Sequence, residues 1–430
     1  MDQIAAYPRA PEDYLVSVAL LLTWPVYLIG GLYVLGPVLA VSLTALVFSR
    51  ALFSGVGHGI YPLNPIPIGL WVWIAGMGAM LIALEIAHIG HQLGAGQTLK
   101  STIGWAKGWA LFIMFPLAGA CLSIRIETLI RAAGYLSLMT LCLIPVFLVA
   151  PTIGLPETLY VSPLKYVGGP GPEFFSVSLY SLEPTDGSAR FRFFTPWSPA
   201  AGFIGNMYLI FALSDRRLKW KILGVVSAVL VIWFSKSRLG LAAAMVIWPT
   251  VMLVSRANRP ILYFAGTAGA LVSVPFLEIA LRKVDETLSA VKSMRADSTR
   301  VREALGEIAV ERWWTEAPVW GHGVVERGPH FVEFMPIGSH HTWYGLLFVK
   351  GAVGALALVI PLAWSLIDCA LAAVTRLEGK IGLGMVLLMI IYSVGENLEI
   401  LTYLMWPGLI AMGMALRHRT PCQETVRTAT

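Results

Sequence analysis

Apolar runs about 15–24 residues long recur along this chain, and they constrain its fold more than any other feature. Each is close to the ~20 residues with which a helix crosses a hydrocarbon core about 30 Å thick. Because lipid offers the backbone no hydrogen-bond partners, such runs form helices. We predict about twelve membrane-spanning helices, at 14–30, 33–48, 66–84, 105–121, 132–150, 199–213, 221–235, 239–255, 260–281, 343–366, 380–395 and 399–416.

Composition excludes an ordinary soluble protein. Hydrophobic residues make up 57% of the 430 residues, charged residues only 13%, and the mean hydropathy is +0.72. Soluble domains typically carry about 25% charged residues. We therefore predict an all-α integral membrane protein, with residues 1–430 forming a single polytopic membrane domain.

Basic residues indicate the orientation of this domain. On one side, the short connections and tails are rich in them: Arg9, Arg50, Arg125, Arg131, Arg216, Arg217, Lys219, Lys221, Arg256, Arg259, Arg376, Lys380, Arg417, Arg419 and Arg427. On the other side, the short turns carry fewer: Lys100, Lys107, Lys236 and Arg238. The positive-inside rule therefore places both termini in the cytoplasm.

Two long loops are predicted on the outer side, at 151–198 and 282–341. Long loops are exempt from the charge rule. We interpret several of their basic residues as a solvated surface balanced by neighbouring glutamates: Arg282, Lys283, Lys292, Arg302 and Arg312. No cysteine lies in either loop, so we expect no disulfide there.

Arginines near the predicted membrane edge are candidates for binding phosphate. Arg190 and Arg192 precede the sixth span, and Arg238 lies in the turn between the seventh and eighth spans. A guanidinium group binds phosphate oxygens bidentately. The alternative is that these side chains reach lipid headgroups along the membrane surface.

An amphipathic helix is predicted within the second long loop. Asp297 or Ser298 is its expected cap, and one face carries apolar side chains: Val301, Leu305, Ile308 and Trp313. Such a helix lies on or near the bilayer surface. Arg300 falls in its first turn, where free N–H groups and the helix dipole also favour anions.

Two adjacent histidines, His340 and His341, close the second loop just before the tenth span. Imidazole accepts a proton from a hydroxyl near neutral pH, so the pair is a candidate general base. We interpret His322 and His330 as structural hydrogen-bonding residues. The histidines and glutamates of this loop match no compact metal-binding motif, so we predict no metal and no cofactor.

The spacing around His340 resembles the signature of the O-antigen ligase/polymerase superfamily of bacterial membrane glycosyltransferases. His340 is followed by His341, nine further residues, Gly351 and then Gly354. The family has an amide or hydroxyl residue where His341 stands. Other stretches resemble further family motifs: Ser298 to Arg300 with Trp313, Pro318 and Gly321 to Gly323; Ser237-Arg238; and Arg190 to Pro199, where Trp197 replaces an asparagine.

This resemblance implies an outward-facing cavity in the bacterial inner membrane, with a periplasmic active site. The implied donor is a glycan linked to undecaprenyl diphosphate, and in the ligase branch the acceptor is lipid A–core. His340 is then the general base, and Arg300 and Arg192 bind the diphosphate. Further substrate contacts are expected from Arg190, Arg238, His341 and Lys350. Membrane lipid is the only other partner expected, and nucleic acid is not.

Two other functions stay open at this point. A repeat-unit polymerase of the same superfamily passes the glycan to another lipid-linked glycan, and its Arg-x10-Gly spacing occurs at Arg295–Gly306, Arg312–Gly323 and Arg327–Gly338. A lipid-linked glycan transporter is the third possibility. It is supported less, because ionisable residues are nearly confined to span ends, as at Glu85, Glu396 and Glu399.

Overall fold

A computed structural model describes residues 10–53, 63–183, 187–260, 282–283, 296–338 and 341–417. Most of the described chain is helical. The helices are α1 (Pro11–Leu21), α2 (Thr23–Leu28), α3 (Leu32–Phe53), α4 (Ile68–Gly90), α5 (Ala95–Lys107), α6 (Leu111–Cys121), α7 (Ile126–Val149), α8 (Ser198–Ser214), α9 (Leu218–Phe234), α10 (Arg238–Val254), α13 (Ala296–Glu316), α14 (Thr342–Ala373), α15 (Leu377–Ser393) and α16 (Leu398–Ala415).

Helices overlap every predicted span except 260–281, which lies outside the described residues apart from Pro260. Six stretches of the described chain are long and apolar enough to cross a membrane: Leu32–Phe53, Ile68–Gly90, Ala95–Cys121, Ile126–Val149, Thr342–Ala373 and Leu398–Ala415. Helices α8 and α10 are apolar but shorter. The helical, membrane-embedded and multi-pass character of the chain is thus supported, and the number of twelve spans stays a prediction.

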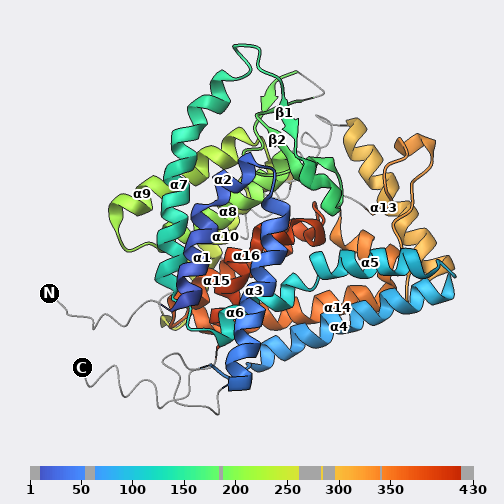
Figure 1. Ribbon diagram of the computed structural model, residues 1–430, viewed down its shortest axis with the longest axis horizontal. Coiled ribbons are helices and arrows are strands. Elements are labelled where there is room, and N and C mark those ends of the chain that lie inside the picture. Colours follow the sequence, from blue (N-terminus) through green and yellow to red (C-terminus); the bar gives the residue numbers. More distant parts are fainter. Residues whose placement is uncertain are drawn as a thin grey trace.

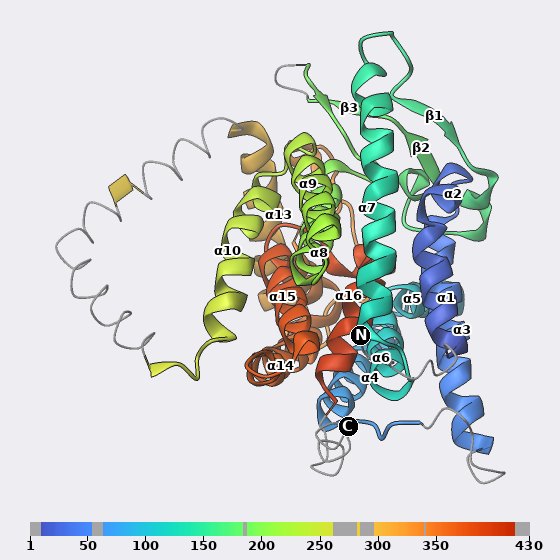
Figure 2. The ribbon, with the colours of Figure 1, turned by 90° about the vertical axis from the view of Figure 1, so that its left-hand side faces the viewer.

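The helices form two groups (Figure 1). Helices α1, α3 and α7 stand upright at one side, whereas α4, α5 and α14 run across toward the other side, where α13 lies. The view from the side shows α15 and α16 between α10 and α7 (Figure 2). Helix α16 is the most enclosed, with every residue from 401 to 416 buried against helices that include α6, α15 and α3.

The first long loop contains short strands that the all-α prediction did not include. β1 (Thr158–Val161) pairs with β2 (Ser176–Ser178), and β3 (Ser181–Leu182) pairs with β4 (Ala189–Arg190), both antiparallel. Strands of two to four residues leave almost no periodic pattern in a sequence. Their effect is to hold Arg190 and the approach to α8 in a fixed conformation.

Helix α13 occupies the second long loop, starting one residue before the predicted cap. The side chains of Asp297 and Ser298 lie outside the part that the structure describes. Val301, Leu305 and Ala309 are buried, and they pack with Leu84 of α4 and Phe348 of α14. The apolar face of this helix therefore rests on protein, not on lipid.

Helix α14 is interrupted at Gly351, whose φ of 62° and ψ of −163° are not helical. The amides of Ala352 and Val353 do not bond within the helix but donate to the carbonyls of Pro318 (2.9 Å) and Val319 (3.2 Å). In exchange, the amides of His322 and Gly323 donate to Phe348 O (2.8 Å) and Val349 O (2.9 Å). The loop segment 318–323 thus supplies every hydrogen bond that the interruption removes from these four groups.

Close backbone approach explains the glycines at this interruption. A Cβ on Gly351 would lie 2.3 Å from Val319 O, and one on Gly321, whose φ is 70°, would lie 2.5 Å from Gly351 N. The close neighbour of Gly351 is therefore the loop segment 318–323, not another membrane-spanning helix. Gly351, the first glycine of the motif that begins at His340, is therefore the residue at which the loop segment 318–323 hydrogen-bonds to the interrupted helix.

We predict that Gly351→Ala destabilises the protein by about 2–5 kcal/mol. An alanine is strained in this backbone region, and its methyl group overlaps Val319 O. Thermal or SDS-induced unfolding in detergent measures the effect. Gly78→Ala is the matched control, because Gly78 is inside α4 with nothing within 4 Å of an added Cβ. Equal stability of the two variants would contradict the prediction.

Candidate functional site

A cavity of about 1200 Å³ lies where the two long loops meet the helices. Its walls come from α5, the connection 167–174, the start of α8, the loop 323–338, the start of α14 and the connection into α16. Helix α5 contributes a long side of it, and none of the residues of this helix is buried. A space of this size accommodates a ligand larger than an ordinary small metabolite.

Charge in this cavity is unusually dense for so apolar a chain. Among the described residues that line it, five are cationic and three are acidic: Lys100, Lys107, Arg190, Arg302 and Lys350 against Glu173, Glu396 and Glu399. A concave site with more cations than carboxylates attracts anionic ligands, and low-dielectric walls strengthen that attraction.

Lys350 is the most enclosed of these cations, with only 4% of its surface exposed. It immediately precedes the interruption of α14 at Gly351. Its Nζ lies 3.9 Å from Glu399 Oε2 and 5.6 Å from the centre of the Trp109 ring. The separation from Glu399 exceeds hydrogen-bond distance, so this ammonium group can donate hydrogen bonds to an anion in the cavity.

Glu396 is a buried carboxylate in the connection between α15 and α16. Trp197 Nε1 donates a 2.9 Å hydrogen bond to its Oε2, and Thr342 Oγ1 donates a 2.7 Å bond to its backbone oxygen. Burial raises the pKa of Glu396 to about 7, although Arg302, the Trp197 hydrogen bond and Arg190 act in the opposite direction. The group is therefore near its midpoint of ionisation at neutral pH.

The two arginines before α8 have different surroundings. Arg190 pairs with Glu183 (Nη1–Oε2 3.0 Å) and lines the cavity. Arg192 donates to the carbonyls of Pro196 (3.2 Å) and Tyr180 (3.3 Å), and burial lowers its pKa. Arg192 is not among the described residues that line the cavity. Its observed contacts stabilise the loop backbone.

On α13 it is Arg302, not Arg300, that lines the cavity among the described residues. Two positions apart on a helix, these side chains point in different directions. Arg302 is exposed, as its interpretation as a surface residue implied, but it also lines the cavity. That interpretation missed the cationic side chain that α13 presents to the site.

The motif histidine, His340, lies outside the described residues. Gly338, two residues before His340, and Thr342, directly after His341, both line the cavity. His341 caps α14: its Nδ1 accepts a 3.4 Å hydrogen bond from Tyr344 N, and its ring stacks on that of Tyr344 at 4.0 Å. Burial lowers the pKa of His341, which favours the neutral, accepting form.

Other predicted residues have structural surroundings. Arg238 is exposed at the start of α10 and does not line the cavity within the described part of the chain. His322 is buried, with Nδ1 3.0 Å from Phe348 O and Nε2 2.8 Å from Glu316 Oε2, as expected for a structural histidine. Among the described residues, no three His, Cys, Asp or Glu side chains gather as a metal site.

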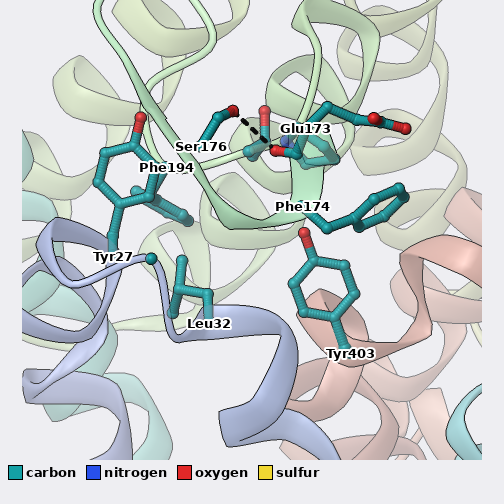
Figure 3. Close-up of a pocket in the computed structure, with 10 residues that line it drawn as sticks. Tyr27, Leu32, Glu173, Phe174, Ser176, Phe194 and Tyr403 are labelled. Atoms are coloured by element: carbon teal, nitrogen blue, oxygen red, sulfur yellow. Dashed lines mark hydrogen bonds between the residues drawn. The ribbon is translucent and has the colours of Figure 1, made fainter. Parts of the chain in front are cut away.

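A second, much smaller pocket of about 10 Å³ lies beside the cavity (Figure 3). Tyr27 and Tyr403 reach it from the helices below, toward the segment in which Ser176 Oγ donates to Glu173 O at 2.9 Å. Glu173 lines both spaces. This volume holds about one water molecule, so the pocket is no substrate site.

No known protein family matches the sequence, and no curated protein matches it either. A functional proposal therefore depends on the motifs and on the cavity. The sequence alone pointed to Arg190 and Lys350, which line the cavity, but not to Trp197 or Arg302 as parts of the site. For Glu396 and Glu399, the sequence feature that could have indicated a place in the cavity is their position at the ends of apolar spans, where acidic residues are uncommon.

We predict that Arg302→Gln weakens the binding of inorganic diphosphate by about tenfold or more, since a hydrogen bond to a charged group contributes roughly 1.5–3 kcal/mol. Calorimetry on the purified protein in detergent measures this. Arg300→Gln is the matched control on the same helix and is expected to bind within about twofold of wild type. The reverse order of the two variants would show that Arg300 faces the ligand.

Proposed function

We propose that this protein is a membrane glycosyltransferase that moves a polysaccharide from undecaprenyl diphosphate to a sugar hydroxyl of lipid A–core, as an O-antigen ligase does. The observation that supports it most is a convergence. Stretches that carry separate motifs in the sequence border one cavity, through Arg190, Gly323, Gly338, Thr342 and Lys350. A lipid-linked polysaccharide needs such a large site, open to the outer side of the membrane.

The cations of the cavity match a diphosphate donor. In this proposal Arg302, Arg190 and Lys350 provide the contacts to the diphosphate, because these three line the cavity. Arg300 and Arg192, which the motifs nominate for this role, do not line it in the described structure. Positive groups fixed in a low-dielectric site stabilise the charge that develops on the leaving diphosphate.

The reaction is a displacement at the anomeric carbon of the donor. The acceptor hydroxyl oxygen forms a bond to this carbon, while the bond from the carbon to the diphosphate oxygen breaks. The diphosphate leaves with the bonding electrons, and the hydroxyl proton passes to a base. His340 acts on the acceptor hydroxyl, either as this base or by orienting it. Diphosphate is a good leaving group, so no nucleotide is required.

The ends of the described chain agree with the predicted topology. Asp13, near the start of α1, pairs with Arg125 (2.8 Å), and Arg417, after α16, donates to Ala120 O (2.8 Å). Both ends therefore lie at the connection between α6 and α7. The cavity is at the opposite end of α16, beside Glu396 and Asn397. With the termini in the cytoplasm, the site is periplasmic.

The decisive experiment is the analysis of surface glycan in a strain that lacks the protein. We predict that lipid A–core loses all polymer while long glycan accumulates on its diphosphate carrier. Electrophoresis of lipopolysaccharide and extraction of the carrier lipids measure this. Lipid A–core capped with a single repeat would instead mean a polymerase, and an unchanged profile would favour transport, which an uptake assay with an ion gradient examines.

We predict that His340→Ala abolishes complementation of this strain while the protein still accumulates in the membrane. Loss of the imidazole removes the group that acts on the acceptor hydroxyl, at a cost of about 10²–10⁴ in rate. His330→Ala, in the same loop and exposed, is the control and should complement fully. Normal polymer on lipid A–core in the His340→Ala strain would contradict the assignment.

A further inference from the structure

Glu396 is a buried carboxylate without a role in the reaction proposed above. Only 5% of its surface is exposed, yet it lines the cavity. Trp197 bonds to Oε2, and among the described residues no hydrogen bond reaches Oε1. A buried carboxylate with one hydrogen bond is costly compared with an amide, which would keep the bond to Trp197 without a charge. Its presence therefore indicates a function.

The backbone of Glu396 is held against the start of α14. Thr342 Oγ1 donates to Glu396 O (2.7 Å) and accepts from Leu398 N (3.1 Å), while Glu396 N donates to Tyr392 O (2.8 Å). Thr342 directly follows the histidine pair in the sequence. The carboxylate is therefore fixed in position next to the segment that carries the motif.

Charged and titratable groups face Glu396 from several elements. Arg302 of α13 and Arg190 of β4 favour its ionised form, as does the hydrogen bond from Trp197, whereas burial opposes it. Tyr392 of α15 is the neighbouring titratable group on the other side. With a pKa of about 7, the carboxylate can both accept and release a proton at the pH of the periplasm.

We propose that Glu396 is a catalytic residue that takes up the proton of the acceptor hydroxyl during glycosyl transfer. This inference rests on the proposed function. As the hydroxyl oxygen bonds to the anomeric carbon and the diphosphate departs with its electron pair, the proton moves to the Glu396 carboxylate. In this mechanism His340 is not the base but orients the hydroxyl. The protonated Glu396 returns its proton to water, and Arg302 and Arg190 restore the carboxylate by favouring its charge.

The test is glycosyl transfer by purified protein, with a lipid-diphosphate-linked glycan as donor and lipid A–core as acceptor, between pH 5.5 and 9. We predict that wild-type kcat falls below about pH 7 as Glu396 becomes protonated. Glu396→Gln should lower kcat about 10²–10⁴-fold, remove this acidic limb and leave the KM for the donor little changed. Glu333→Gln is the control: it makes the same change at an exposed glutamate of the second loop, and this variant should behave as wild type.

Thermal unfolding separates catalysis from folding. Because folding raises the pKa of Glu396 from 4.5 to about 7, the unfolded chain releases this proton first, and the free energy of unfolding falls as the pH rises from about 4.5 to about 7. Glu396→Gln is therefore expected to match wild type in Tm at about pH 4, where the carboxyl is neutral in both states, and to exceed it at pH 7 and above. Glu396→Asp, which keeps a shortened carboxylate, should retain partial activity and the acidic limb.

The outcomes distinguish the two proposals. If wild-type protein transfers no glycan, the proposed function falls and the role of Glu396 with it. If wild type is active and Glu396→Gln keeps kcat within about threefold with an unchanged pH profile, the role of Glu396 alone is overturned. If Glu396→Gln loses activity because it unfolds, and Glu396→Asp is folded but lacks the acidic limb, the residue is structural and the proposal is overturned.

Discussion

The arrangement of the site depends on one exchange of backbone hydrogen bonds. Where α14 is interrupted at Gly351, two amides and two carbonyls lose their helical partners, and an apolar interior offers no water to replace them. The loop segment 318–323 bonds all four. This exchange joins the second long loop to the helix bundle. It sets Val324 and Val325 on one wall of the cavity and Lys350 on another.

The second organising constraint is electrostatic. A chain that is only 13% charged brings eight charged side chains to the wall of one cavity, and it buries two of them, Lys350 and Glu396. Burial of such groups opposes folding unless a partner or a function compensates. Lys350 has a partner in Glu399 that is too distant for a hydrogen bond, and Glu396 has one hydrogen bond from Trp197. Both groups therefore keep hydrogen-bonding capacity that faces the cavity.

Sequence patterns anticipated the helices well because burial in lipid demands length and apolarity, and both are visible in a single sequence. They also singled out Gly351 and the glycines at 321 and 323, whose common role became clear only in three dimensions. The short strands β1 to β4 escaped, since their few residues carry no periodicity. The sequence favours Arg300 as a site residue and Arg302 as a surface residue, whereas Arg302 lines the cavity. The face of α13 that meets the cavity is set by the packing of Val301, Leu305 and Ala309 on other helices, and a single sequence does not show that packing.

The amino-acid sequence by itself determined that this chain is a multi-pass helical membrane protein, because the free energy of placing residues in lipid depends mainly on local composition. It also determined which residue types are available for binding an anion near the membrane edge. Only the tertiary structure decided which of them meet. Arg190, Arg302, Lys350 and Glu396 come from four segments far apart in the chain, and their convergence on one cavity follows from helix packing and from the loop built into α14. Such packing arises from contacts between distant residues, and no local pattern encodes it.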